Sequence, residues 1–311
     1  MTSTPAPIVL DDRDVLAEMA PTAAKLMERH LDRSKEWFPH EIVPWSRGRD
    51  FTPGEATPAD PQLPDAVQSA LVVNLLTEDN LPYYTQSIGR IVGIDDVWGE
   101  WTRRWTAEEG RHSQVIRDYL CVTRNVDLHA LERARMIQVS HGYEPQNTHT
   151  PLDLFVYLAL QELATRIAHR NTGALLDDEA GTDVMARVAA DENLHFLFYR
   201  DLVSASLEAF PEATVAAIER QVRSFEMPGS GLPGFDDHAR RIAKAGIYDV
   251  PIHLTRILEP TVLRDWGVET LELQAGPATE MRDKLFEFIG RLRRVVARVQ
   301  ERAARTEKVD A

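Results

Sequence analysis

Two segments, WTAEEGRHSQVIRD (residues 105–118) and AADENLHFLFYRD (residues 189–201), decide the fold expected of this chain. Each segment contains a Glu followed three residues later by a His, and the two pairs are Glu109 with His112 and Glu192 with His195. Residues three apart in a helix share one face, so each helix would present a carboxylate and an imidazole to the same point. The segments therefore predict two helices that bind one metal site from two sides.

A single Glu upstream of each pair extends this pattern. Glu78 lies in SALVVNLLTEDNLPYY (residues 69–84) and Glu162 in PLDLFVYLALQELATRIAHR (residues 151–170), both of which are mostly apolar. Burying a lone carboxylate is costly unless a metal or a donor compensates, although each Glu could instead lie at the edge of an apolar stripe and face water. The sequence predicts six ligands: Glu78, Glu109, His112, Glu162, Glu192 and His195.

This ligand set is typical of a carboxylate-bridged dinuclear centre in a four-helix bundle. In such bundles two helices each give one Glu, and two others each give a Glu-x-x-His pair. Carboxylates and imidazoles suit hard, redox-active ions better than metals that prefer thiolates. We therefore expect about two iron ions per chain, with manganese as the alternative metal.

Three further side chains are expected to support the ligands. Asp191 and Glu108 each precede a ligand Glu and can reach the opposite helix, so Asp191 is predicted to hold His112 and Glu108 to hold His195. Either acid could instead be exposed on its own helix. Thr165 lies three residues after a ligand Glu, so its hydroxyl could bond an oxygen species at the metals or simply its own backbone.

Apolar residues recur at helical spacing along most of the chain, and the few strand-like runs have no alternating partners. We expect an all-α, ferritin-like di-iron four-helix bundle with additional flanking helices. Pro82 predicts either a kink or a helix that ends near Asn80. The predicted helices span residues 11–34, 64–91, 96–123, 127–141, 151–176, 180–208, 211–226, 234–247, 251–263 and 278–306.

Length and composition limit the architecture and the class of function. The 311 residues, 43% of them hydrophobic, can form a single domain over residues 1–311, with an N-terminal arm (1–63), a bundle core (about 64–208) and C-terminal helices (about 209–306). A net charge of −14 argues against nucleic-acid binding. The one cysteine, Cys121, excludes a four-cysteine iron–sulfur cluster within the chain, so electrons must come from another molecule.

The beginning of the chain shows no basic region followed by an apolar core, so neither a secretory signal nor a transit peptide is expected. No apolar stretch approaches the ~18–20 residues that are needed to cross a bilayer. The sequence therefore predicts a cytoplasmic protein without membrane insertion.

The segments that carry these residues resemble the soluble acyl-acyl-carrier-protein desaturases, whose plant member is stearoyl-carrier-protein desaturase. The similarity is specific in LLTEDNLPYY, WTRRWTAEEGRH, ALQELAT, RNTG and AADENLHF, and it extends more weakly from WFPHEIVP to beyond Ile247. It implies that Glu109 and Glu192 bridge the irons, while Glu78 with His112 and Glu162 with His195 complete the two ends. Trp37 matches a Trp that joins the positions of Asp191 and His112 in an electron path, although it could also be a surface aromatic.

The chain departs from the family pattern at three positions inside the ligand pairs. Gly110 stands in place of the usual Asn, which puts a helix-weakening residue at the site at a nominal cost of ~1 kcal/mol. Asn193 and Leu194 replace residues that are commonly basic. No departure touches a ligand, so we expect the metal site to be retained.

The activity that this resemblance implies is O2-dependent desaturation of a fatty acyl chain carried as a thioester of acyl-carrier protein. The implied partners are acyl-carrier protein, a ferredoxin-type electron donor and a second copy of the chain. Other di-iron oxidases (a hydroxylase or a radical-generating subunit) and a ferritin-like iron-binding protein remain alternatives. A radical subunit needs a Tyr close to the metal, and Tyr83 and Tyr84 lie near Glu78 in the sequence.

Carrier proteins are acidic, so an acidic enzyme can bind one only through clustered cations. Two clusters are candidates on the sequence: Arg29, Arg33 and Lys35, and Arg240, Arg241 and Lys244. Solvated helix faces are the alternative interpretation of both.

Overall fold

The structure is a computed structural model that describes residues 10–52, 54, 63–143, 148–227, 229, 232 and 234–309. Every regular element within these residues is helical, as the spacing of the apolar residues predicts. The elements are α1 (Asp12–Arg33), α2 (Pro39–Ile42), η1 (Trp45–Arg47), α3 (Asp65–Glu78), α4 (Leu81–Val92), α5 (Asp96–Thr123), α6 (Leu128–His141), α7 (Pro151–Ala174), α8 (Glu179–Ala209), α9 (Pro211–Ser224), α10 (Phe235–Lys244), α11 (Val250–Ile252), the π-helix η2 (His253–Asp265) and α12 (Pro277–Val309). Among the described residues, no helix is both long enough and apolar enough to span a membrane.

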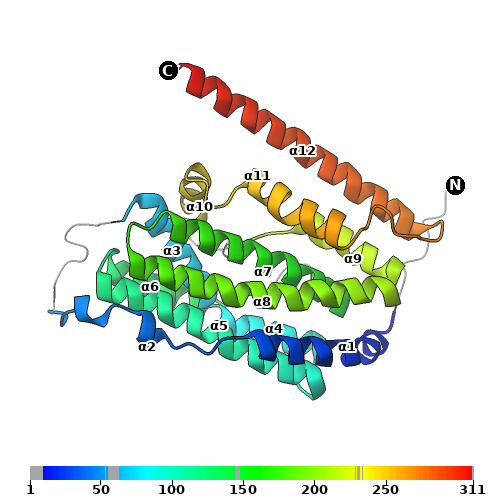
Figure 1. The fold of residues 1–311 in the computed structure, drawn as a ribbon, viewed down its shortest axis with the longest axis horizontal. Helices are drawn as coiled ribbons and strands as arrows, with labels where there is room; N and C mark the ends of the chain where they lie inside the picture. Colours follow the sequence, from blue (N-terminus) through cyan, green and yellow to red (C-terminus); the bar gives the residue numbers. More distant parts are fainter. Residues whose placement is uncertain are drawn as a thin grey trace.

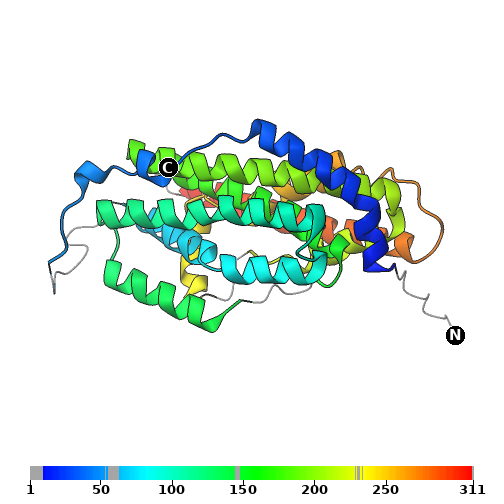
Figure 2. The same cartoon turned by 90° about the horizontal axis from the view of Figure 1, so that it is seen from below.

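A bundle of long helices forms the centre of the molecule (Figure 1). Helix α7 packs along α8, α5 packs against α8 and against both α3 and α4, and α3 contacts α7. Seen from below, α1 crosses the outer side of α8, while α4 and α6 lie on the side of α5 away from α8 (Figure 2). Helices α9, η2 and α12 cover the opposite side, where α12 diverges from the bundle towards the C-terminus (Figure 1).

The break between α3 and α4 falls directly after a predicted ligand. Helix α3 ends at Glu78 and α4 begins at Leu81, so the helix ends near Asn80 rather than continuing through a kink at Pro82. Pro82 lies in the first turn of α4, where its missing N–H needs no helical partner. The buried Asn80 side chain is fixed from outside the bundle, because its Oδ1 accepts a hydrogen bond from Gln138 Nε2 at 3.0 Å.

One close crossing determines how α5 meets α8. A Cβ atom added to Gly181 would lie 2.5 Å from Tyr119 Oη, so only glycine fits there without a shift. Tyr119 Oη donates a hydrogen bond of 2.7 Å to Asp178 at the start of α8, and Arg47 forms an ion pair with the same carboxylate at 2.8 Å. This end of the bundle is thereby fixed by packing and charge together.

Two apolar clusters fill the bundle, and a polar layer lies between them. On α5, Trp105 belongs to one cluster and Val115 to the other. On α8, Val188 belongs to the second cluster and Phe196 to the first. Both Glu-x-x-His pairs fall in the interval between these residues, so the predicted ligands lie inside the molecule with apolar packing on either side.

Candidate metal centre

The structure brings the six predicted ligands together inside the bundle, and none of them is more than 7% exposed. Their ligand atoms form two groups, each with all atoms within 4.8 Å: Glu78, Glu109, His112 and Glu192, and Glu109, Glu162, Glu192 and His195. Glu109 and Glu192 belong to both groups, so they lie between two adjacent places for a cation. Four helices contribute, and each pair comes from one helical turn, as the spacing of three predicts.

The imidazole of His112 faces carboxylates on both sides. Its Nδ1 lies 3.4 Å from Glu109 Oε2, 3.4 Å from Glu192 Oε1 and 3.9 Å from Glu78 Oε2. Its Nε2 lies 3.4 Å from Asp191 Oδ2. A proton on Nε2 would be held by Asp191 and would leave Nδ1 free to bind a metal.

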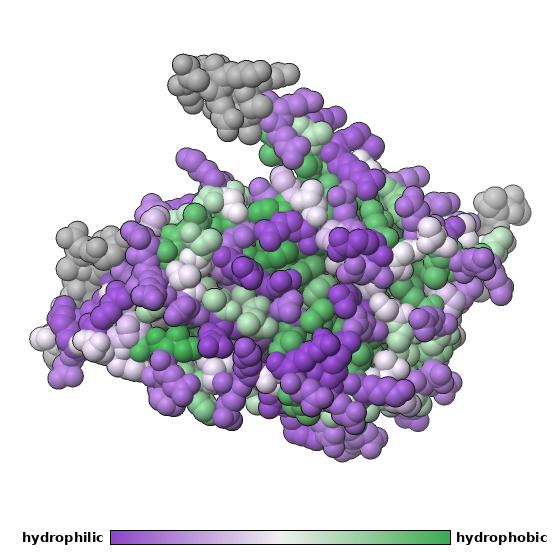
Figure 3. All heavy atoms as spheres, viewed as in Figure 1, coloured by the Kyte–Doolittle hydropathy of each residue, from purple (hydrophilic) through white to green (hydrophobic). Residues whose placement is uncertain are grey.

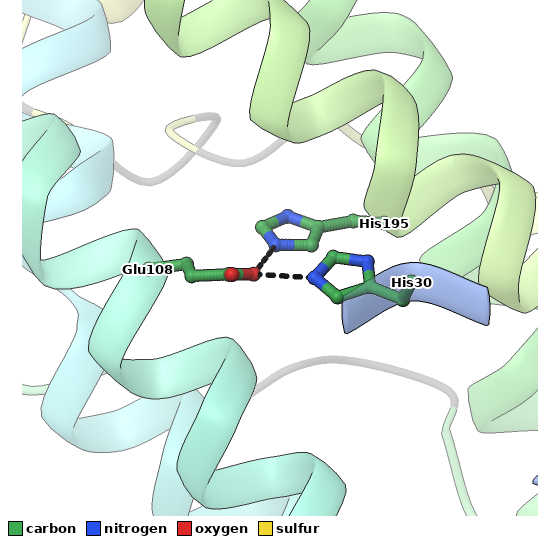
Figure 4. A group of neighbouring side chains, drawn as sticks. All are labelled: His30, Glu108 and His195. Atoms are coloured by element: carbon green, nitrogen blue, oxygen red, sulfur yellow. Dashed lines mark hydrogen bonds and ion pairs between the residues drawn. The ribbon is translucent and has the colours of Figure 1, made fainter. Parts of the chain in front are cut away.

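His195 has the equivalent arrangement at the other end. Its Nδ1 lies 2.8 Å from Glu109 Oε1 and 3.6 Å from Glu162 Oε2, while its Nε2 hydrogen-bonds Glu108 Oε2 at 2.9 Å. The same Glu108 oxygen is 2.8 Å from Nε2 of His30, so two imidazoles from α1 and α8 converge on one carboxylate from α5 (Figure 4). The contact of Glu108 with His195 agrees with the prediction from the sequence, whereas His30 was not predicted.

Several buried atoms at the centre form no well-aligned hydrogen bond, although ion-pair contacts bring them together. They are Glu109 Oε1, Glu162 Oε2, and the Nδ1 atoms of His112 and His195. Leaving such groups unpaired in a dry interior costs free energy, and a cation placed among them would remove that cost. The donor set, with carboxylate oxygens and imidazole nitrogens and no thiolate, fits a hard transition-metal ion.

The pKa values of the ligand side chains also indicate that the cluster attracts positive charge. Burial, together with the charge of neighbouring carboxylates, raises the pKa of Glu78 and of Glu162 well above the usual value. Burial alone would lower the pKa of His112 and His195, but the surrounding carboxylates outweigh it and raise both values. The cluster therefore attracts positive charge, and without a metal it holds protons instead.

Asp191 connects the centre to Trp37. Its Oδ2 accepts hydrogen bonds from Trp37 Nε1 at 3.0 Å and from Arg111 Nη2 at 2.9 Å, and it also faces His112. Trp37 is 3% exposed, so it is not a surface aromatic, and the Arg111 guanidinium lies 4.7 Å from the centre of its ring. The three side chains Trp37, Asp191 and His112 thus form one continuous chain of contacts.

The hydroxyl of Thr165 faces the cluster as well as its own backbone. Its Oγ1 donates a hydrogen bond of 2.6 Å to Glu192 Oε2 and lies 3.1 Å from the carbonyl oxygen of Glu162. Its bond to an oxygen species at the metals stays a prediction.

Two other side chains at the centre were not predicted from the sequence. His169 Nε2 lies 3.6 Å from Glu78 Oε1 and 3.7 Å from Glu192 Oε1, and burial lowers the pKa of His169 to about 4. Trp105 Nε1 donates a hydrogen bond of 2.9 Å to Glu162 Oε1. The signal for His169 was its position seven residues after a ligand Glu, which puts it on the same helical face.

Two apolar cavities meet at the centre and share Thr77, Glu78 and Thr165. The α10-side cavity continues between α3, α7 and α10, and its wall includes Val73, Ala168, His169, Phe235, Ile242, Ile247 and Tyr248. The α4-side cavity continues along α4 and α7, and its wall includes Tyr84, Ile88, Trp105, Leu154, Tyr157 and Leu158. The two cavities therefore place apolar walls on either side of Glu78 and Thr165, where an apolar substrate could approach the carboxylates.

The two tyrosines near the first ligand have different surroundings. Tyr83 Oη donates a hydrogen bond to the carbonyl oxygen of Val139 on α6, away from the centre. Tyr84 lines the α4-side cavity, where its ring meets that of Tyr143 edge-on with ring centres 5.1 Å apart. Of this pair, only Tyr84 lines a cavity that reaches the ligands.

Comparison with known proteins agrees with this geometry. A family model described as fatty acid desaturase matches residues 11–311. The chain belongs to this family. A relative from Mycobacterium tuberculosis named acyl-[acyl-carrier-protein] desaturase DesA1 is 41% identical over 286 residues, which cover 89% of this chain and 84% of the relative. The chloroplastic stearoyl-[acyl-carrier-protein] 9-desaturase of Brassica napus is 29% identical, over 91% of this chain and 76% of its own.

The fold agrees as well. The X-ray structure of acyl-ACP desaturase DesA2 from Mycobacterium tuberculosis superposes with a TM-score of 0.70 at 28% identity, over 86% of this chain and 99% of that one. The predicted all-α, ferritin-like fold and the resemblance to acyl-carrier-protein desaturases are confirmed.

Proposed function

We propose that this protein is a di-iron desaturase that introduces a double bond into a fatty acyl chain delivered as a thioester of acyl-carrier protein. The observation that carries the proposal is the meeting of six buried ligands with two apolar cavities at Glu78 and Thr165. The family and the printed names of the relatives support it. A protein that stores iron needs no apolar cavities beside its metals, so the two cavities at Glu78 favour an organic substrate.

The side chains of this protein would bind, orient and isolate the substrate. The acyl chain would lie through both cavities, so that two of its carbons pass Glu78 and Thr165 while the walls exclude water. Iron bound by the six ligands would supply, together with O2, the oxidising power that unactivated C–H bonds require. In the overall reaction the acyl chain loses two hydrogen atoms. O2, together with two electrons and two protons, becomes two molecules of water.

The electrons must come from outside the chain, because it has one cysteine and can form no iron–sulfur cluster of its own. We propose a ferredoxin-type donor and a route through Trp37, Asp191 and His112, whose contacts run without interruption to the ligands. Asp191 and Glu108 would hold the two ligand imidazoles in the tautomer that binds metal. A homodimeric enzyme is proposed on family resemblance alone.

The test is to purify the protein, measure its metals, and supply stearoyl-carrier protein, ferredoxin, ferredoxin reductase, NADPH and O2. We expect about two irons per chain and an unsaturated acyl product detected by mass spectrometry. Omitting ferredoxin should stop turnover. Glu192→Ala should remove a ligand shared by both metal positions and abolish activity, so full iron occupancy with unchanged turnover in this variant would contradict the assignment.

A further inference from the structure

Three arginines without carboxylate partners, Arg166 and Arg170 on α7 and Arg256 on η2, are close enough that, besides burial, the charges of two lower the pKa of the third, Arg166. Arg166 and Arg170 are one turn apart on the same face of α7. Arg256, on η2, reaches α7 through a contact of 3.4 Å from its Nη1 to Asn171 Oδ1. Within the described part of the chain, no ion pair to a carboxylate involves any of the three.

This clustering is unusual for a chain with a net charge of −14. Other arginines of the chain are paired, for example Arg29 with Asp201 at 2.6 Å and Arg240 with Asp237. Two cations of the clusters considered from sequence are thus already neutralised. Arg166 is half-buried, whereas Arg170 and Arg256 are exposed. Burial and the positive charges beside it lower its pKa, so an anion placed here would relieve repulsion.

The three arginines are next to residues that line the α10-side cavity, although none of them lines it. Asn171 holds Arg256 through its Oδ1 and donates from Nδ2 to the carbonyl oxygen of Ile247 at 2.8 Å. Ile247 lines the cavity, as does His169, which lies between Arg166 and Arg170 in sequence. An anionic group bound by the arginines would therefore lie at the rim of the cavity that leads to Glu78.

The chemistry of the site favours a compact anion. Guanidinium groups bind phosphate oxygens through paired, charge-assisted hydrogen bonds, and two arginines one turn apart on α7 with a third on η2 suit a single phosphate better than a broad acidic surface. The arm that links an acyl thioester to a carrier protein contains one phosphodiester. We propose that Arg166, Arg170 and Arg256 bind the phosphodiester of the phosphopantetheine arm while the acyl chain occupies the cavity. This inference rests on the proposed function.

The test compares two soluble thioesters with the same saturated acyl chain, acyl-phosphopantetheine and acyl-pantetheine, which differ only in the phosphate. Binding to the iron-loaded protein is measured by calorimetry, so the readout does not depend on turnover. Arg170→Gln with Arg256→Gln removes two exposed cations, and Arg166→Gln is tested separately because that residue is half-buried. The matched control is Arg133→Gln with Arg298→Gln, which changes net charge equally at two exposed positions elsewhere.

We expect the double variant to weaken binding of acyl-phosphopantetheine about tenfold or more, and to leave acyl-pantetheine binding and iron content unchanged. The control variant should bind both thioesters as the unmodified protein does. Equal affinities of the unmodified protein for the two thioesters would overturn the inference. So would a loss that appears only with the intact carrier protein, because the arginines would then contact the acidic carrier surface.

Failure of this inference is distinguishable from failure of the proposed function. If the arginine variants desaturate normally and their thioester affinity is unchanged, the inferred phosphate site is wrong while the proposed function is retained. If binding depends on the phosphate but the bound acyl chain is never desaturated, the inferred phosphate site is retained and the proposed function is wrong.

Discussion

At the scale of single residues, the carboxylate of Glu108 contacts three side chains that can carry positive charge. One of its oxygens accepts hydrogen bonds from both His30 and His195, and Arg104 lies 2.5 Å from the other. These partners outweigh the effect of burial and lower the pKa of Glu108, so it stays charged. A charged and immobile Glu108 fixes the ring of His195, whose other nitrogen faces the predicted ligands.

We expect His30→Ala to weaken iron binding at the His195 end about tenfold, because Glu108 would lose one of the donors that fix it. His30→Gln should restore most of the affinity, since the Gln amide can donate to the same oxygen. The measurement is competition for iron with a chelator, together with the Mössbauer spectrum of the bound iron. Equal affinities in the two variants would show that His30 contributes only packing.

The convergence of the six side chains could be predicted at this scale because helical spacing is a local property. Glu109 and His112 share a face wherever the helix lies, and four helices with such faces leave few ways to bury them. His30 could not be found in this way, because its partner lies 78 positions away in the chain. Its only local signal is that it ends the buried stripe of α1.

At the scale of elements, α5 runs without interruption through Gly110, which lies inside a ligand pair. A Cβ atom there would come no closer than 3.9 Å to Leu81 Cδ2, which is ordinary contact. The glycine is therefore not required by packing, in contrast to Gly181 at the crossing with Tyr119.

We expect Gly110→Ala to stabilise the folded protein by about 0.5–1 kcal/mol, through helix propensity, without changing iron content. Gly181→Ala should instead destabilise it by about 1–3 kcal/mol, because the added methyl group overlaps Tyr119. Urea unfolding of the iron-loaded proteins measures both. A loss of stability in Gly110→Ala would mean that the backbone at the metal centre needs the freedom of glycine.

Helix boundaries were predictable to within a few residues where caps are local. Thr150 accepts a hydrogen bond from the backbone N–H of Asp153, and this cap sets the start of α7 at Pro151. The break after Glu78 could not be decided, because the missing N–H of Pro82 is compatible with a kink as well as with a new helix. The π-helical form of η2 also has no pattern in apolar spacing that separates it from an α-helix.

At the scale of the whole molecule, the cavities result from packing of helices that are distant in sequence. Phe235 and Tyr248 meet Glu78 across the α10-side cavity, and no local pattern joins them. The sequence could therefore predict the family and a buried cluster of Glu and His that could hold metal, but it could not predict which surface leads to that cluster. The unpaired arginines of α7 and η2 could not be predicted either, because tertiary contacts decide which charged side chains form ion pairs.

The metal centre also couples the stability of the whole chain to pH. In the metal-free protein the pKa values of Glu78, Glu162, His112 and His195 are raised by burial of the acids and by the carboxylates around the imidazoles. Around neutral pH the folded chain thus keeps protons that the unfolded chain has released. The stability that these protons contribute is lost as the pH rises through the folded pKa values.

We expect the melting temperature of the metal-free protein to fall between about pH 6 and pH 8.5, while that of the iron-loaded protein changes less, because bound metal replaces the protons. The difference between the two melting temperatures should therefore widen with pH, and iron binding should release protons that a pH indicator detects. Glu78→Gln with Glu162→Gln removes two of the titrating groups, so its metal-free form should lose much of the slope. A difference that stays constant over this range would mean that the six residues do not exchange protons for metal, and that iron binds elsewhere in the molecule.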